Sequence, residues 1–274
     1  MSNATAPATL EAAEDLVRDA LAQTAGGLLV VGICGAQGSG KSTLAAALAE
    51  RFEQGGTRTA ILSLDDLYLG RAAREGLARQ VHPLLRTRGV PGTHDVALGL
   101  NLIAALERGE AAPLPRFDKA RDDRRPETEW DRAEPGTTLL ILEGWCVGAR
   151  PEPDAALVDS INALEQSEDA DGRWRRFVNT ALAGDYQQLF GRIDRLILLA
   201  APSFDVVRVW RTQQEQELRA RVGDGPGVMS DAEISRFIAH YERLTRHIII
   251  EMPDRADLVV DLAADRSALR IKHR

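Results

Sequence analysis

Two hydrophobic patterns alternate along the chain: short runs of consecutive apolar residues, and longer segments in which apolar residues recur every three or four positions. The continuous runs are typical of buried parallel strands and occupy residues 27–34, 59–64, 137–144, 193–200 and 256–263. The periodic segments are typical of helices and occupy residues 8–24, 42–54, 96–109, 154–190, 204–221 and 230–251. Because strands alternate with helices, the pattern predicts an α/β fold, with helices on both faces of a mostly parallel five-stranded sheet.

Polar and turn-forming residues interrupt this alternation at three places. Residues 65–94 are rich in loop signals, and residues 112–136 combine four prolines with many charges, which predicts an exposed loop or hairpin. The stretch "SEDADG" at 167–172 predicts a break in the fourth helical segment. Ser230, followed three residues later by Glu233, forms a capping-box pattern at the start of the last helix.

No repeat, low-complexity tract or linker divides the sequence, so we expect residues 1–274 to form a single domain. Within it we distinguish an N-terminal helix at 1–26, insertions between strands at 66–136, and a helical region at 204–251. The chain is long enough to bury a full hydrophobic core without disulfides or metals.

Composition and charge exclude several classes of protein. The formal net charge is −7 and the pI about 5.4, which disfavours a general nucleic-acid-binding role. No apolar stretch reaches the length of a membrane span, and no basic segment with an apolar run follows the N-terminus, so we expect a soluble, cytoplasmic protein. Cys34 and Cys146 lie in apolar runs and are expected to be buried thiols rather than zinc ligands.

A glycine-rich segment joins the first predicted strand to the helix that follows it. Gly35, Gly40, Lys41 and Ser42 fit the phosphate-loop pattern G-x-x-x-x-G-K-[ST]. Its glycines let backbone N–H groups wrap a triphosphate, and the following helix points its positive dipole end at the phosphates. We therefore predict a nucleotide site made of Gly35, Ala36, Gln37, Gly38, Ser39, Gly40, Lys41, Ser42 and Thr43. Lys41 would reach the β and γ phosphates, and Ser42 would ligate Mg²⁺.

Carboxylates follow two of the predicted strands, at the sheet edge where ligands of α/β proteins bind. Asp65 and Asp66 end the second strand, and Glu143 ends the third. Asp65 is the predicted general base, with Asp66 as the weaker candidate. Glu143 resembles a Walker-B acid. The predicted magnesium ligands are Ser42, Asp65 and Glu143.

Cationic side chains complete the predicted site. Arg208 and Arg211 lie three residues apart on the helix at 204–221, and we select Arg211 to neutralise charge on the transferring phosphate. Basic loops inside an acidic chain indicate an anionic acceptor, because guanidinium groups bind carboxylates through paired hydrogen bonds. The predicted acceptor residues are Tyr68, Arg88, His94, Asp95, Arg116, Asp118 and Lys119. For His94, capping of the helix at 96 is an alternative role, and Trp145 is expected to be a packing residue.

Several motifs occur in an order that resembles one known family. They are the phosphate loop, "LSLDDLYL", "RGVPGTHD", "PRFDKARDDR", "ILEGWCVG", "WRTQQE" and "GVMSDAEISRFIAHYERLT". Together they resemble the P-loop glycerate kinases, relatives of phosphoribulokinase, uridine kinase and pantothenate kinase, from about residue 28 to the C-terminus. The resemblance implies ATP-dependent phosphorylation of D-glycerate at its 3-hydroxyl, with Asp65 as the base and Arg211 in a helical lid.

Other functions stay open on the sequence alone. A nucleoside or pantothenate kinase of the same superfamily is the nearest alternative, although the arginine-rich loops favour an acid as the acceptor. A nucleotide switch or chaperone is a second, but no N-K-x-D guanine motif is present. An ATP-binding protein without chemistry is a third, against which Lys41, Ser42, Asp65 and Glu143 argue. The expected partner is a small anionic acceptor, with no nucleic acid or membrane, and a homodimer is left open.

Overall fold

The computed structural model describes residues 6–222 and 229–274, which include a six-stranded sheet in the order β10-β9-β8-β1-β7-β2. The five predicted strands are all present and run parallel, as β1 (Leu29–Gly35), β2 (Thr59–Ser63), β7 (Leu139–Gly144), β8 (Arg195–Ala200) and β9 (Leu258–Leu262). The predicted count of five is wrong by one, because β10 (Ala268–His273) adds an antiparallel strand at the edge. Its exposed, basic sequence carries no buried apolar run.

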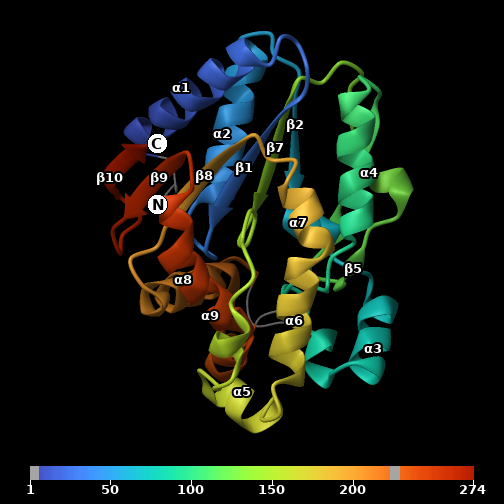
Figure 1. Ribbon diagram of the computed structural model, residues 1–274, viewed down its shortest axis with the longest axis vertical. Coiled ribbons are helices and arrows are strands. Elements are labelled where there is room, and N and C mark those ends of the chain that lie inside the picture. The colour runs from blue at the N-terminus through green and yellow to red at the C-terminus, as the bar shows by residue number, and fades with distance from the viewer. Residues whose placement is uncertain (1–5, 223–228) are drawn as a thin grey trace.

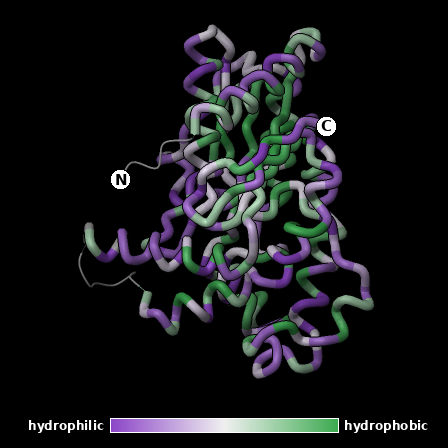
Figure 2. The backbone as a smooth tube through the Cα atoms, turned by 90° about the vertical axis from the view of Figure 1, so that its left-hand side faces the viewer, coloured by the Kyte–Doolittle hydropathy of each residue, from purple (hydrophilic) through white to green (hydrophobic). Residues whose placement is uncertain are grey.

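Apolar cores cover both faces of this sheet. Along β1, Leu29, Val31 and Ile33 belong to one core, whereas Val30 and Cys34 belong to the other, because successive side chains of a strand point to opposite faces. Figure 2 shows the apolar strands gathered in the interior. This double burial is why the strands were readable as continuous hydrophobic runs.

Helices form the two outer layers (Figure 1). α1 (Pro7–Gln23) and α2 (Lys41–Gln54) cover one face. α4 (Val96–Glu107) and α7 (Asp185–Phe190) cover the other. The three-layer α/β/α prediction is therefore confirmed. The described helices also include α3 (Arg71–Gln80), α5 (Ala163–Glu168), α6 (Arg173–Ala183), α8 (Phe204–Val222) and α9 (Asp231–Glu251). Single 3₁₀ turns lie at Leu64–Leu67, Pro83–Arg86, Glu127–Glu129, Asp154–Leu157 and Met252–Asp254.

The structure confirms four local predictions. The break at 167–172 is confirmed between α5 and α6, and the capping box of Ser230 and Glu233 starts α9. Residues 112–136 form the predicted hairpins, in which β3 (Ala112–Leu114) pairs with β6 (Asp131–Ala133) and β4 (Phe117–Asp118) with β5 (Asp123–Arg124). Cys34 and Cys146 are buried free thiols. None of the helices in the described residues is long and apolar enough to span a membrane.

Helix α3 was not predicted, because it has no apolar stripe. It is held instead by the buried guanidinium of Arg74, which donates to the carbonyls of Leu69, Arg86 and Asp122 at 2.6–3.0 Å. Satisfying the guanidinium with main-chain carbonyls removes the cost of burying it. The helix therefore depends on contacts that are distant in sequence.

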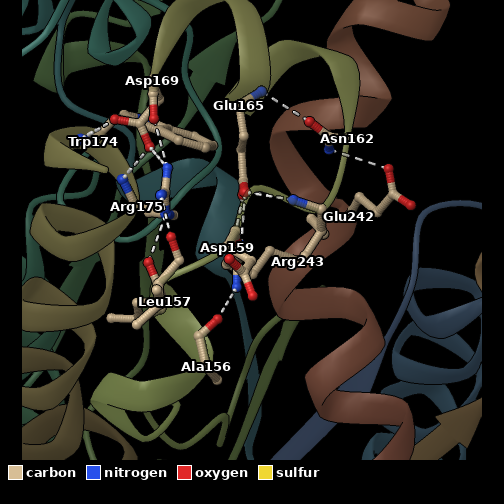
Figure 3. A network of polar contacts seen from close by, with 12 residues as sticks. Ala156, Leu157, Asp159, Asn162, Glu165, Asp169, Trp174, Arg175, Glu242 and Arg243 are labelled. Atoms are coloured by element: carbon tan, nitrogen blue, oxygen red, sulfur yellow. Dashed lines mark hydrogen bonds and ion pairs between the residues drawn. The ribbon is translucent and has the colours of Figure 1, made fainter. Parts of the chain in front are cut away.

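Buried ion pairs join α9 to the segment that contains α5 and α6 (Figure 3). The guanidinium of Arg243 donates to both carboxylate oxygens of Glu165 at 2.7 and 2.8 Å. The Arg175 guanidinium pairs with Asp169 at 2.9 Å nearby. The Arg243 pair fixes α9, whose residues Phe237 and Tyr241 line the cavity described below, and the Arg175 pair holds the partner segment together.

Candidate active site

The phosphate loop follows β1 directly and ends where α2 begins at Lys41. Gly38 and Gly40 have φ of 81° and 92°, in the left-handed region that favours glycine. A Cβ added to Gly38 would lie 2.7 Å from the Cβ of Trp210 on α8. The loop is thus wrapped as the motif predicts, with its glycines fixed both by backbone conformation and by the close approach of α8.

A cavity of about 360 Å³ lies beside this loop, at the carboxyl ends of the parallel strands. Lys41 and Ser42 from α2, Asp65 after β2 and Glu143 at the end of β7 line it together. The lining also includes Tyr68, Arg88, Lys119, Trp145, Arg211, Glu215, Phe237 and Tyr241. The sheet therefore brings together the predicted phosphate and carboxylate groups from three separate segments.

Ser42 and Glu143 form a pair that suits a hard cation. The Ser42 hydroxyl donates to Oε1 of Glu143 at 3.0 Å, and Oε2 of Glu143 is buried with no hydrogen-bond partner among the described residues. An unpartnered buried carboxylate oxygen beside a hydroxyl fits Mg²⁺, which prefers oxygen ligands and keeps waters and substrate phosphates in its shell. No cluster of three or more acidic, histidine or cysteine ligands occurs in the described parts of the chain.

Asp65 lies in the 3₁₀ turn directly after β2, with its carboxylate on the cavity. Its Oδ1 accepts a hydrogen bond from the Tyr68 hydroxyl at 2.7 Å, and its Oδ2 accepts one from the Lys119 ammonium at 2.6 Å. Burial raises the pKa of Asp65, but the charges of Lys119 and Lys41 outweigh burial and hold this pKa well below its usual range. The group is therefore an ionised carboxylate at neutral pH.

The neighbouring Asp66 does not line the cavity. Its carboxylate accepts hydrogen bonds from the backbone N–H of Phe117 at 2.9 Å and from Arg116 at 3.2 Å. Burial raises its pKa above the usual value. Asp66 thus anchors the β4–β5 hairpin against the end of β2, which leaves Asp65 as the carboxylate that faces the phosphate loop.

The predicted acceptor residues separate into two groups. Tyr68, Arg88 and Lys119 line the cavity. The side chain of Arg88 pairs with Asp122 and lies 5.5 Å from the centre of the Phe117 ring. The cavity lining, as far as the structure describes it, does not include the other four, which are His94, Asp95, Arg116 and Asp118.

His94 lies behind Tyr68 rather than in the cavity. Its ring stacks on Tyr68 with 4.7 Å between ring centres, and Nδ1 is 2.5 Å from the hydroxyl of Tyr186. Burial lowers the pKa of His94 to about 4, so the ring is neutral. The alternative that His94 caps the helix at 96 is wrong: Asp95 is the N-cap of α4 and accepts from the Leu98 N–H at 3.1 Å.

The other three residues hold the hairpin and its surroundings in place. Asp95 pairs with Arg124 at 3.1 Å in addition to capping α4. Arg116 bridges Asp66 and Asp131. Asp118 accepts from the N–H groups of Ala120 and Arg121 in the hairpin turn. A charge count along the sequence does not distinguish such paired groups from those that face a ligand.

The helices α8 and α9 close the other side of the cavity. Arg211 pairs with the buried Glu215 at 2.7 Å, and its guanidinium lies 5.6 Å from the centre of the Phe237 ring. Arg208 is exposed. The sequence did not single out Phe237 or Tyr241, because an aromatic cavity residue on an amphipathic helix carries the same signal as a core residue. It did not single out Glu215 either, because this buried acid lies in the polar run QQEQE and is indistinguishable there from an exposed one. Trp145 is buried as expected, but it also lines the cavity.

Known proteins resemble this chain over most of its length. A family model described as methylmalonyl Co-A mutase-associated GTPase MeaB matches residues 1–68, which include the phosphate loop. The uncharacterized kinase mug58 of Schizosaccharomyces pombe is 39% identical over 227 residues, which are 77% of this chain and 78% of that protein. The chloroplastic D-glycerate 3-kinase of Arabidopsis thaliana is 30% identical over 224 residues, and this match covers 78% of this chain and 46% of that relative.

A solved structure agrees with these relatives. The D-glycerate 3-kinase from Cryptococcus neoformans superposes with a TM-score of 0.80 at 26% identity, over 98% of this chain and 100% of that one. The MeaB match is confined to residues 1–68, whereas the match to mug58 covers 77% of this chain and the superposed D-glycerate 3-kinase 98%. The chain therefore belongs to the family of P-loop kinases that includes mug58 and D-glycerate 3-kinase, and it is a phosphotransferase.

Proposed function

We propose that this kinase transfers the γ-phosphoryl group of ATP to a hydroxyl of a small hydroxy acid, with D-glycerate as the acceptor. The observation that carries the proposal is the position of Asp65. Its carboxylate lines one cavity together with Lys41 and Ser42 of the phosphate-loop region and with the cations Lys119 and Arg88. A molecule with a carboxylate and a nearby hydroxyl matches that set of groups.

On the donor side, the loop at 35–42 binds the triphosphate through its N–H groups, and Lys41 adds a positive charge. Ser42 and Glu143 hold Mg²⁺, directly or through water. When bound, the ion neutralises phosphate charge during transfer. Arg211, on the wall formed by α8, adds a further cation near the transferring group.

On the acceptor side, Lys119 and Arg88 bind the carboxylate, and Tyr68 positions Asp65. The acceptor hydroxyl oxygen then bonds to the γ-phosphorus while the bond from that phosphorus to the β–γ bridging oxygen breaks, and the hydroxyl proton passes to Asp65. A carboxylate with a low pKa is adequate here, because the loose transition state of phosphoryl transfer gains more from positioning and charge neutralisation than from a strong base.

A coupled assay of ADP release tests this assignment. D-glycerate, uridine, pantothenate and ribulose 5-phosphate are each supplied with ATP and Mg²⁺, and we expect turnover with D-glycerate alone. Turnover with uridine alone would instead assign the protein to the nucleoside kinases. This outcome is a real alternative, because Tyr68, Trp145, Phe237 and Tyr241 give the cavity an aromatic wall.

A further inference from the structure

The two oxygens of Asp65 have partners that differ sharply in exposure. Oδ1 is bound by the hydroxyl of Tyr68, a buried residue that stacks on His94. Oδ2 is bound at 2.6 Å by the ammonium of Lys119, whose side chain is 61% exposed. The Tyr68 contact therefore fixes the orientation of the carboxylate, while the Lys119 contact can be broken without moving any core residue.

The position of the Lys119 ammonium matters for chemistry. A carboxylate oxygen that already accepts a short, charge-assisted hydrogen bond is a weaker acceptor for a second proton. With Lys119 in this place, one lone pair of Oδ2 is occupied, and Oδ2 is a weaker proton acceptor for water as well as for an alcohol. Oδ1 is occupied by Tyr68 in the same structure.

Lysine is a rare choice in this chain. Of its 34 Lys and Arg residues, only Lys41, Lys119 and Lys272 are lysines. An ammonium on a flexible stem acts as a point charge that can change partners, whereas a guanidinium is fixed by paired bonds. Around Lys119, ion pairs with Asp122, Asp66 and Asp95 hold the guanidinium groups of Arg88, Arg116 and Arg124.

We propose that Lys119 blocks the base until the acceptor arrives. Without acceptor, its ammonium holds Oδ2 of Asp65. The carboxylate of the acceptor draws the ammonium away, and Oδ2 becomes free to accept the proton of the acceptor hydroxyl. This inference rests on the proposed function, because it requires an anionic acceptor.

The blocking contact would protect ATP from water. In hydrolysis, a water oxygen bonds to the γ-phosphorus, the bond to the β–γ bridging oxygen breaks, and the water proton passes to Asp65. That reaction needs the same free Oδ2 as transfer to an alcohol. By occupying Oδ2, Lys119 makes release of the base conditional on the presence of a carboxylate.

The test compares ATP hydrolysis by the wild type and by Lys119→Met, both without acceptor. We expect the variant to hydrolyse ATP about threefold faster or more, because its base is unblocked. Its KM for D-glycerate should rise about tenfold or more, with the KM for ATP unchanged, because one carboxylate contact is lost. Lys272→Met is the matched control: Lys272 pairs with Asp261 on β9 and does not line the cavity.

A second measurement uses D-lactate, which has the carboxylate of D-glycerate but lacks the 3-hydroxyl. D-lactate should stimulate ATP hydrolysis by the wild type about threefold or more, since it removes Lys119 without supplying the attacked hydroxyl. D-lactate should leave the rate of ATP hydrolysis by Lys119→Met unchanged. Because the Lys119 side chain is largely exposed, the variant is expected to keep the wild-type thermal unfolding midpoint.

Two kinds of failure are distinguishable. Equal hydrolysis rates in the wild type and Lys119→Met, with no selective response to D-lactate, would overturn the blocking role even if D-glycerate is a good substrate. A wild type that releases no ADP with D-glycerate would instead overturn the proposed function.

Discussion

Asp65 and Asp66 are consecutive, yet their carboxylates have different surroundings. Asp65 faces the cavity between two lysines, and Asp66 is turned to the hairpin at Phe117. The 3₁₀ turn at Leu64–Leu67 sends the two side chains in different directions. Chemistry at this strand end therefore depends on one of two residues that look equivalent in the sequence.

Replacing Asp65 by Asn should remove the proton acceptor while keeping the shape of the side chain. We expect kcat to fall by about 10²–10⁴, the usual range for loss of a general base, with the Kd for ATP nearly unchanged. Steady-state kinetics and ATP titration measure the two effects. Asp66→Asn is the control, and its kcat at saturating acceptor should stay near the wild-type value. A fully active Asp65→Asn would exclude the base assignment.

The pH dependence follows from the same group. Burial alone would raise the pKa of Asp65, but Lys119 and Lys41 hold it below the usual range before the acceptor binds, so wild-type kcat/KM for the acceptor should be flat from about pH 5 to 7. Lys119→Met removes the charge with the larger effect, so the pKa of Asp65 rises and the carboxylate becomes protonated at higher pH. The acidic limb of kcat/KM should therefore move upward in pH. Profiles of kcat/KM for the acceptor at saturating ATP test this, and an unmoved limb would contradict it.

At the scale of elements, the loop at Arg88 and Gly89 is fixed by its contacts with α9 and with Trp145, which follows β7. Gly89 has a φ of 130°, and a Cβ there would lie 1.9 Å from the Tyr241 hydroxyl on α9. That hydroxyl donates to the Arg88 carbonyl at 3.0 Å, and the Trp145 indole donates to the Gly89 carbonyl at 2.9 Å. The position of α9 thus sets where Arg88 lies in the cavity.

The buried pair of Arg243 and Glu165 holds α9 in that position. Glu165→Leu leaves the buried Arg243 guanidinium with only the more distant carboxylate of Glu152, at 3.7 Å, and we expect the free energy of unfolding to fall by about 3–5 kcal/mol. Adding Arg243→Met should recover part of this loss, because the unpaired charge is removed. Urea denaturation measures both.

The matched control is the exposed pair of Arg236 and Glu168, which joins the same two helices. Arg236→Met should cost about 1 kcal/mol or less, as solvent screens this contact. If Glu165→Leu and Arg236→Met lower the free energy of unfolding equally, burial does not strengthen the pair of Arg243 and Glu165.

At the scale of the whole molecule, burial decides what the sequence could predict. The strands buried on both faces were found, and so were the phosphate loop and the acids at the strand ends, because each has a local signal. Strand β10 and helix α3 were missed, since an exposed edge and the buried Arg74 leave no apolar pattern. The acceptor residues were only partly placed, because the partners that occupy Arg116 and Asp95 are far away in sequence.

The phosphate loop itself depends on the end of the chain. Arg266, in the turn between β9 and β10, donates through Nε to the Gly38 carbonyl at 2.6 Å and lies 5.3 Å from the centre of the Trp210 ring. The first contact holds the loop directly, and the second holds Trp210, which packs against Gly38. The turn that leads into the edge strand, which the sequence did not reveal, therefore supports the motif that the sequence revealed most clearly.

Arg266→Asn tests this support. Arg266 has a φ of 71°, which Asn tolerates, so the substitution removes the guanidinium without adding backbone strain. Losing a hydrogen bond worth about 1–1.5 kcal/mol should raise the KM for ATP about five- to tenfold, because the carbonyl of Gly38 is left unpaired and the loop loses its fixed shape. The KM for the acceptor should not change. Arg270→Asn, on β10 at an exposed ion pair with Asp261 of β9, should leave both constants unchanged. If the KM for ATP is unaltered in Arg266→Asn, the loop holds its conformation through β1 and α2 alone.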